Sequence, residues 1–356
     1  MAPLDPLFEY RVHPTRASLE APLGRDSMTL EGLAARCDEG DAYVTGFMTI
    51  RGKSRFIAAP RPELDAVQRR INLLLYPIDL SLGASPHGYV ARRSTLTNAR
   101  PHVGARFLQK FDVKDYFASI TASRIATALT ELGFGSEAAT LISRLTSHRL
   151  RLPLGARTSP RISNILLIDF DDQMENLARE QGLRYTRYAD DLAFSSQIAF
   201  DVSDRVEQAI RAAGFELNPM KTKQFKHGQP MFVTGLSIQD ATRPRVRRRL
   251  KARLRQEFYY IEKFGIEDHA AAVGESWRGV LHRLTGQFHY CRTIEPQFTA
   301  QLTLDFPAAS SSVAPVHEDS RVERAQRHRR EFVAEVMRQL PTAIPFYVPQ
   351  ADLFEN

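Results

Sequence analysis

Three aspartates, Asp112, Asp190 and Asp191, are expected to lie close together in the folded chain. Asp190 and Asp191 are adjacent, and Asp112 lies near the end of an earlier alternating run. Neighbouring carboxylates repel unless a cation lies between them, although an Asp pair also suits a simple turn. A third carboxylate on a neighbouring strand would complete an all-oxygen magnesium site. Two Mg²⁺ ions about 3.5–4 Å apart would then clamp the attacking and leaving oxygens of a phosphoryl transfer.

Short strands and helices are predicted around these aspartates. Residues 105–113 alternate as a strand does, and residues 183–188 and 192–195 form a predicted hairpin that carries the Asp pair at its tip. Apolar spacing predicts one long helix from 159 to about 181 and another over 203–214. The order strand, helix, hairpin, helix predicts an α+β layer.

Composition excludes several classes of protein. The chain has 356 residues, 43% of them hydrophobic and 25% charged, which excludes disorder as the main state and predicts two or three lobes. No apolar run approaches the roughly 20 residues of a membrane span, and no secretory signal is expected at the start of the chain. Cys37 and Cys291 cannot build a disulfide framework. We expect a cytoplasmic protein with no membrane partner.

The positive charge is concentrated in one segment. Residues 243–255 hold eight Lys or Arg and no acid, which exceeds the net charge of +7 for the whole chain. Such a patch is typical of a nucleic-acid interface, and a solvated helix face is the alternative. The aromatic residues Phe258, Tyr259 and Tyr260 follow, and would either stack on bases or belong to the core.

Four segments resemble the motifs of reverse transcriptases, in the family's order. The sequence YADD at 188–191 is similar to motif C, and FDVKDYFASI at 111–120 is similar to motif A. LPLGARTSPRISN at 152–164 resembles motif B, and GFELNPMKTK at 214–223 resembles motif D. A lone YADD would carry little weight, whereas the ordered series is specific.

Two further elements resemble the bacterial retron enzymes within that family. Residues 98–102 match the retron NAxxH element, and residues 233–235 match the VTG element. RFIAAP at 55–60 and HGYVARRS at 87–94 resemble retron finger segments, and residues 277–298 resemble the retron thumb.

The resemblance implies a right-hand polymerase with fingers, a palm of antiparallel sheet and helices, and a helical thumb. We expect an N-terminal extension over 1–40 and a reverse transcriptase core of fingers and palm over 41–240. A basic thumb over 241–305 and a linker with a C-terminal tail over 306–356 follow. The linker is expected because AASSSVAP at 308–315 consists of small residues and Pro.

The same resemblance implies the metal ligands. Asp112 and Asp190 would bind both Mg²⁺ ions, the carbonyl of Val113 would assist, and Asp191 would complete the cluster. Lys221 in motif D is the candidate proton donor to the departing pyrophosphate, although a solvated lysine explains it equally well.

Nucleotide-binding residues follow from the motif register. Phe117, five residues after Asp112, would exclude ribonucleotides by collision with the 2′-hydroxyl, and its neighbour Tyr116 would belong to the core. Gly155 would let the backbone approach the incoming nucleotide. Arg55 and Lys53 would contact the triphosphate, with a solvated charge as the alternative for Lys53.

RNA-binding residues are expected in the retron-like elements and the basic segment. They are Asn98, His102, Val233, Thr234, Gly235, Arg247, Arg248, Lys251 and Arg255. If roughly five of the basic residues touch phosphates, log affinity should fall with log salt with a slope of about −3.5. Leu154 and Arg157 depart from the Gln and Pro common in the family, and the sequence does not explain either.

The implied function is that of a retron-type reverse transcriptase. Its partners would be deoxynucleotides, its own structured noncoding RNA and the single-stranded DNA product. Synthesis would start from an RNA 2′-hydroxyl and give branched msDNA, in anti-phage defence beside a separately encoded effector, with ribonuclease H acting in trans. The alternatives are a group II intron-like or abortive-infection enzyme, and an RNA-binding scaffold or toxin-neutralising module.

Overall fold

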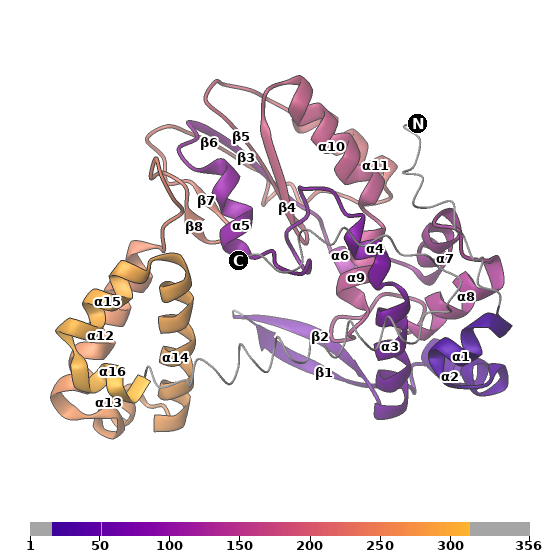
Figure 1. Ribbon diagram of the computed structural model, residues 1–356, viewed down its shortest axis with the longest axis horizontal. Coiled ribbons are helices and arrows are strands. Elements are labelled where there is room, and N and C mark those ends of the chain that lie inside the picture. Colours follow the sequence, from indigo (N-terminus) through magenta and orange to yellow (C-terminus); the bar gives the residue numbers. More distant parts are fainter. Residues whose placement is uncertain (1–15, 51, 314–356) are drawn as a thin grey trace, which may run out of the picture. The chain divides into compact units, whose positions relative to one another are not determined.

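The computed structural model describes residues 16–50 and 52–313, which form two compact units (Figure 1). Among these residues the first unit consists of 16–81 and 115–166, and the second of 82–114 and 167–313. The segment similar to motif A is therefore divided, with Phe111 and Asp112 in the second unit and Tyr116 and Phe117 in the first.

The first unit is largely helical. Its elements are η2 (Ala17–Leu19), α1 (Glu20–Leu23), α2 (Ser27–Glu39), β1 (Tyr43–Ile50), β2 (Lys53–Pro60), α3 (Pro62–Leu74), α4 (Tyr76–Leu80), α6 (Tyr116–Ser119), α7 (Ala122–Glu131), α8 (Ser136–Leu145) and α9 (Ser159–Ile165). Helices α2, α3 and α7 pack against α8, and Leu30, Ile71 and Ile142 are fully buried. Of the predicted N-terminal extension, residues 16–40 are integral to this unit, because α1 and α2 supply part of its core.

Strands β1 and β2 form an antiparallel hairpin whose register runs from Tyr43 opposite Pro60 to Ile50 opposite Lys53. The base of the hairpin is fixed inside the unit, where Ala58 N donates to Leu154 O at 2.9 Å. Its outer part is exposed, including Phe47.

The second unit contains a four-stranded antiparallel sheet of order β4-β5-β3-β6. Its other elements are the short helices α5 and η3, the helices α10 and α11 and the small hairpin β7–β8. The bounds are α5 (Thr95–Ala99), η3 (Arg100–His102), β3 (Phe107–Asp112), α10 (Ile168–Glu180), β4 (Arg184–Tyr188), β5 (Asp191–Ser196), α11 (Ser203–Ala212), β6 (Lys223–Lys226), β7 (Phe232–Val233) and β8 (Leu236–Ser237). Helices α10 and α11 lie along one face of the sheet (Figure 1). The predicted strand, hairpin and helix after residue 203 are confirmed.

The predicted long helix over 159–181 is wrong as a single element. It is two helices, α9 and α10, because Leu167 has ψ of 12° and φ of −115°, which are not helical values. The two helices belong to different units. The break between α9 and α10 therefore lies at the boundary between the two units, and local apolar spacing does not reveal that boundary.

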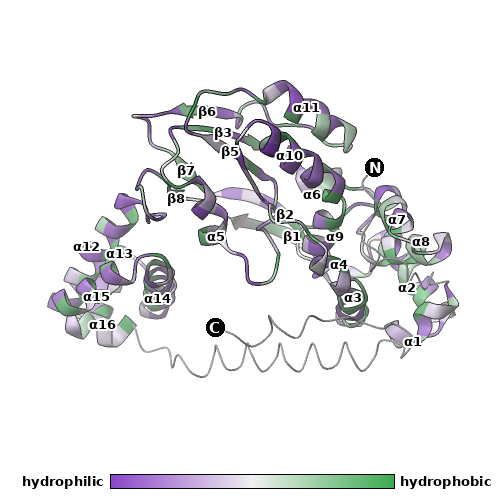
Figure 2. Ribbon diagram, turned by 45° about the horizontal axis from the view of Figure 1, so that its top comes forward, coloured by the Kyte–Doolittle hydropathy of each residue, from purple (hydrophilic) through white to green (hydrophobic). Residues whose placement is uncertain are grey.

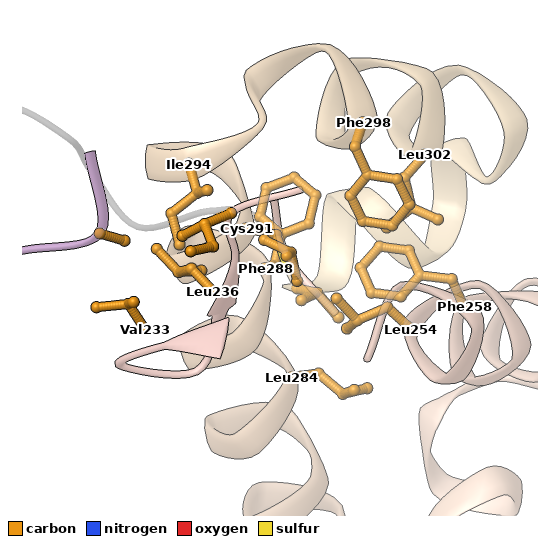
Figure 3. Close-up of a cluster of buried hydrophobic side chains, with 14 of the residues drawn as sticks. Val233, Leu236, Leu254, Phe258, Leu284, Phe288, Cys291, Ile294, Phe298 and Leu302 are labelled. Atoms are coloured by element: carbon orange, nitrogen blue, oxygen red, sulfur yellow. The ribbon is translucent and has the colours of Figure 1, made fainter. Parts of the chain in front are cut away.

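The second unit ends in a helical bundle, which we call the thumb bundle. Its helices are α12 (Arg248–Phe264), α13 (Ile266–Val273), α14 (Trp277–Ile294), α15 (Pro296–Asp305) and α16 (Pro307–Val313). Both polar and apolar residues occur along these helices (Figure 2), in keeping with one buried face each. Figure 3 shows that face, where Phe258 of α12 and Phe288 of α14 stack with ring centroids 5.8 Å apart. Val233 and Leu236 of β7–β8 join the same core.

The predicted linker after residue 305 is wrong for its described part. Residues 307–313 form helix α16, in which Ala309 and Val313 are buried in the thumb bundle. Small residues fit there because they let α16 approach its neighbours closely. The rest of the predicted linker and tail lies outside the described residues.

Cys37 and Cys291 are both buried and free. Among the described helices, none combines the length and the apolar character that crossing a bilayer requires.

Candidate active site

The three aspartates lie at adjoining strand ends of the four-stranded sheet. Asp112 is the last residue of β3 and pairs with Asp191, the first residue of β5. The β4–β5 turn carries Asp190, and its main-chain oxygen accepts from Val113 N at 3.0 Å. Ala189 in the same turn has φ of 56°, a left-handed value that is costly for a residue with a Cβ. We call residues 184–196 the catalytic hairpin.

Negative charge is concentrated at this turn. Burial, followed by the charges of Asp191 and Asp112, raises the pKa of Asp190 to about 6, and Lys221 offsets this only in part. Lys110 Nζ lies 4.0 Å from Asp191 Oδ1. Asp190 is therefore ionised at neutral pH, although the negative charges of Asp191 and Asp112 oppose its ionisation.

Lys221 reaches the site from the loop after α11. Its Nζ lies 2.7 Å from both Oδ1 and Oδ2 of Asp112. The loop is tied to the end of β3, since Asn218 N donates to Asp112 O at 2.7 Å and Val113 pairs with Leu217. The structure thus brings four predicted catalytic residues and Val113 together at one edge of the second unit.

The donor set suits a hard divalent cation, because it contains only carboxylate and carbonyl oxygens. In the described part of the chain, however, no three acidic, imidazole or thiol side chains are grouped closely enough to hold one ion. The ammonium of Lys221 instead contacts both carboxylate oxygens of Asp112. Asp112, Asp190 and Asp191 would hold the ions after Lys221 gives way to them.

A buried ion pair supports the catalytic turn, and the sequence analysis did not identify it. Arg187 of β4 is 0% exposed, and its Nε donates to Asp171 Oδ1 of α10 at 2.8 Å. Arg187 Nη1 also donates to Ala189 O at 3.2 Å, inside the strained turn. A signal was present, because Asp171 stands four residues after Leu167 and three before Met174, in the apolar stripe of α10.

The NAxxH element lies beneath the catalytic hairpin, in the interior. Asn98 and His102 are 1% and 0% exposed. His102 contacts Ser195 Oγ and Thr186 Oγ1, one from each strand of the hairpin. Neither side chain reaches the surface in this structure, so the predicted contact of Asn98 and His102 with RNA stays a prediction that their burial does not favour.

The VTG element is the turn of the β7–β8 hairpin. Thr234 and Gly235 have φ of 45° and 84°, the sign pattern of a two-residue type I′ turn. Thr234 is a poor residue for a left-handed position, but its Oγ1 donates to Thr95 O of α5 at 2.9 Å. Val233 is 1% exposed in the core, which does not favour its predicted RNA contact, whereas Gly235 is exposed.

The predicted nucleotide-binding residues all belong to the first unit. Lys53 and Arg55 are exposed on β2, and Phe117 in α6 is half-buried. Tyr116 is a core residue as predicted, since its hydroxyl donates to Ser163 O at 2.7 Å. Their roles toward a nucleotide stay predictions.

Gly155 and its neighbours bind the motif B loop to other elements of the first unit. Gly155 has φ of 118°, and an added Cβ would meet Ile57 Cγ2 at 2.8 Å. Its close approach is thus to β2, which accounts for the glycine without a nucleotide. Arg157 forms an ion pair with Asp65 of α3, a structural explanation for this departure from the family pattern.

The basic segment is only partly available to a partner. Several of its charges have acidic partners within the second unit, namely Arg245 with Asp240 and Glu295, Lys251 with Glu295, and Arg253 with Glu257. Arg247 and Arg255 lie over the rings of Phe232 and Phe298. Arg248 and Arg249 are exposed and have no carboxylate or ring partner among the described residues.

Comparisons with known proteins agree with the motif order. Residues 44–239 match the family model described as reverse transcriptase (RNA-dependent DNA polymerase). Retron Mx162 reverse transcriptase of Myxococcus xanthus is 34% identical over 306 residues, which cover 75% of this chain and 61% of that protein. Retron Mx65 reverse transcriptase of the same organism is 35% identical over 246 residues, which cover 60% of this chain and 57% of that protein. Retron Ec86 reverse transcriptase of Escherichia coli is 33% identical over 191 residues, which cover 52% of this chain and 59% of that protein. The chain spans about three fifths of the length of these relatives.

Proposed function

Because this chain belongs to the reverse transcriptase family and resembles its retron members, we propose that it is a retron-type RNA-directed DNA polymerase. It copies part of its own structured noncoding RNA into single-stranded DNA. The observation that carries the proposal is the edge of the second unit where Asp112 pairs with Asp191 and the turn holds Asp190 beside them.

The reaction is attack of a primer hydroxyl on the α-phosphate of a deoxynucleotide, with pyrophosphate leaving. Magnesium ions, two in our proposal, would supply charge neutralisation when bound to Asp112, Asp190, Asp191 and the Val113 carbonyl. The protein positions the reactants and needs no covalent intermediate. After Lys221 has left its contact with Asp112, its ammonium donates a proton to the departing pyrophosphate. Phe117 selects deoxynucleotides.

The primer in this proposal is a 2′-hydroxyl of the noncoding RNA, so the product is branched msDNA. The three relatives described above are retron reverse transcriptases, which supports this choice within the family. We place the system in anti-phage defence with a separately encoded effector, and we assign removal of template RNA to a ribonuclease H in trans.

The test is to express the gene with its native upstream DNA and to analyse nucleic acid that copurifies with the protein. Wild type is compared with an Asp190→Asn, Asp191→Asn double variant. Asp204→Asn, an exposed acid on α11, is the matched control. We expect RNA-linked, branched DNA of fixed length from wild type and the control only.

Two results would contradict the proposal in different ways. Unbranched DNA from wild type would remove 2′-hydroxyl priming but keep the polymerase, as in a group II intron-like or abortive-infection enzyme. RNA without DNA in all three proteins would favour an RNA-binding scaffold.

A further inference from the structure

His102 is buried between two hydroxyl groups in the second unit. Its Nδ1 lies 2.7 Å from Ser195 Oγ and its Nε2 lies 2.8 Å from Thr186 Oγ1. All three residues are at most 2% exposed. Burial lowers the pKa of His102 to about 3, so the ring is neutral, with one nitrogen donating and the other accepting. Both ring nitrogens and both hydroxyls are therefore satisfied internally.

The two hydroxyls belong to the two strands that carry the catalytic turn. Thr186 lies on β4 opposite Ala193, and Ser195 lies on β5 in the same alternating series as Asp191. His102 thus contacts the sheet face to which Asp191 belongs. Arg187 belongs to the opposite series and pairs with Asp171 of α10, so the hairpin is held from both faces.

The segment that bears His102 is fixed in turn. Thr186 Oγ1 donates to Asn98 O at 3.3 Å, and Thr234 Oγ1 of the VTG turn donates to Thr95 O. Gly104 N, two residues after His102, donates to Ile238 O at 2.8 Å. The two retron-like elements therefore contact each other, and Asn98 Nδ2 also donates to Thr234 Oγ1 at 3.5 Å.

We propose that His102 is a positioning residue, which joins β4 to β5 and so holds the catalytic aspartates in register with Asp112. The NAxxH and VTG elements then act as an internal support for the hairpin and do not contact RNA through Asn98, His102 or Val233. The left-handed Ala189 makes this support necessary, because a strained turn persists only where its surroundings fix it. The proposal rests on the proposed polymerase function.

The test compares His102→Phe, which removes both hydrogen bonds, with His102→Gln, whose amide can still donate and accept. Primer extension on an RNA template with an annealed DNA primer gives kcat and KM, and filter binding of the same duplex gives Kd. Hydrogen exchange reports the backbone amides of residues 186–195. Ile210→Ala in α11, a buried site away from the hairpin's polar contacts, controls for general loss of stability.

We expect His102→Phe to lower kcat about 10²-fold, with Kd and nucleotide KM nearly unchanged, because small misplacement of reacting groups costs this much. His102→Gln should regain about tenfold of that loss. Amides of the hairpin should exchange faster in His102→Phe than in Ile210→Ala. In a Thr186→Val, Ser195→Ala background the His102→Phe change should have little further effect, because its partners are gone.

Three outcomes would overturn the proposal. One is unchanged kcat with weakened duplex binding, which would assign His102 to RNA contact. Another is a loss of kcat in Ile210→Ala that equals the loss in His102→Phe, when the two variants have the same melting temperature. The third is unchanged hairpin exchange in His102→Phe. If wild type extends no primer, the polymerase proposal fails, while the exchange comparison still decides whether His102 holds the hairpin.

Discussion

Two carboxylates of the second unit, the buried Glu257 and the half-buried Asp190, have opposite electrostatic surroundings. Burial opposes ionisation of Glu257 in the thumb bundle, but hydrogen bonds from Arg283, His269 and Arg253 outweigh it and lower its pKa to about 2. Asp190 has acidic neighbours instead, and burial together with those charges raises its pKa to about 6. The chain compensates one carboxylate fully and leaves the other short of positive charge.

In our proposal this difference separates charges that stabilise the fold from charges that bind a ligand. A compensated group such as Glu257 binds other parts of its own bundle, whereas an uncompensated cluster costs stability that only an external partner repays. The basic segment repeats the contrast in cations, because Lys251 and Arg253 have acidic partners, whereas the exposed Arg248 and Arg249 have none within residues 16–50 and 52–313.

The strongest way to sharpen the comparison is Asp190→Asn. We expect primer extension to fall on the order of 10³-fold, because a group that neutralises transition-state charge is lost. The free energy of unfolding should stay the same or rise, because repulsion from Asp191 and Asp112 decreases. Single-turnover extension and urea unfolding in a metal-free buffer measure both effects. A large stability loss in this variant would mean that Asp190 is a structural carboxylate like Glu257.

The next largest effect should come from Arg187→Met. Removing one partner of a buried pair costs about 3–5 kcal/mol of stability, and Arg187 and Asp171 are 0% and 3% exposed as side chains. Extension should fall about 10²-fold, because Ala189 O loses its donor and the turn can move. Urea unfolding measures the loss of stability, and steady-state primer extension measures the loss of activity.

The double variant Arg187→Met, Asp171→Leu separates support of the turn from packing. Apolar replacement of both partners often restores stability. We expect stability to recover while extension stays low. Recovery of both would show that the ion pair serves packing alone.

Glu257→Gln should affect stability more than chemistry. We expect a loss of about 2 kcal/mol at pH 7, below the value for a fully buried pair, because Arg283 and Arg253 are partly exposed. The folded pKa of Glu257 is lowered from 4.5 to about 2, so its contribution is complete above pH 4.5 and disappears as the pH falls through 2. Urea unfolding of both proteins between pH 7 and 3 should show the curves converging in acid. A constant gap would contradict this assignment.

The sequence was sufficient for features that depend on local pattern. Alternation predicted β3 and the catalytic hairpin, and motif register placed Asp112, Asp190, Asp191 and Lys221 at one edge. Local pattern failed where tertiary packing decides the outcome. The small residues of α16 resembled a linker, because the neighbours that bury Ala309 are distant in the sequence.

The sequence did not identify the partners in the interior contacts of the site either, although the position of Asp171 in an apolar stripe marked one of them as buried. Arg187 and Asp171 are 16 residues apart, and His102 is 93 residues from Ser195. Motif resemblance suggested surface roles for His102 and Asn98, whereas the fold buries both. The retron-like motif thus did not predict that the side chains of Asn98 and His102 face the interior.

The smallest expected effect concerns the unpaired cations of the thumb bundle. Each phosphate contact on single-stranded nucleic acid contributes about 0.7 to the slope of log affinity against log salt. Arg248→Ala with Arg249→Ala should therefore weaken RNA binding and reduce the slope by about 1.4. Titrations of the cognate RNA between 50 and 300 mM salt measure this change.

The matched control is Lys251→Ala with Arg253→Ala, which removes the same charge from the same helix. Because these side chains already pair with Glu295 and Glu257, the slope should change little while the bundle loses stability. If this control reduces the slope as much as the first variant, the pairs must open when RNA binds. Compensation would then not distinguish structural from ligand-binding charges in the thumb bundle, and the contrast would hold only for the carboxylates.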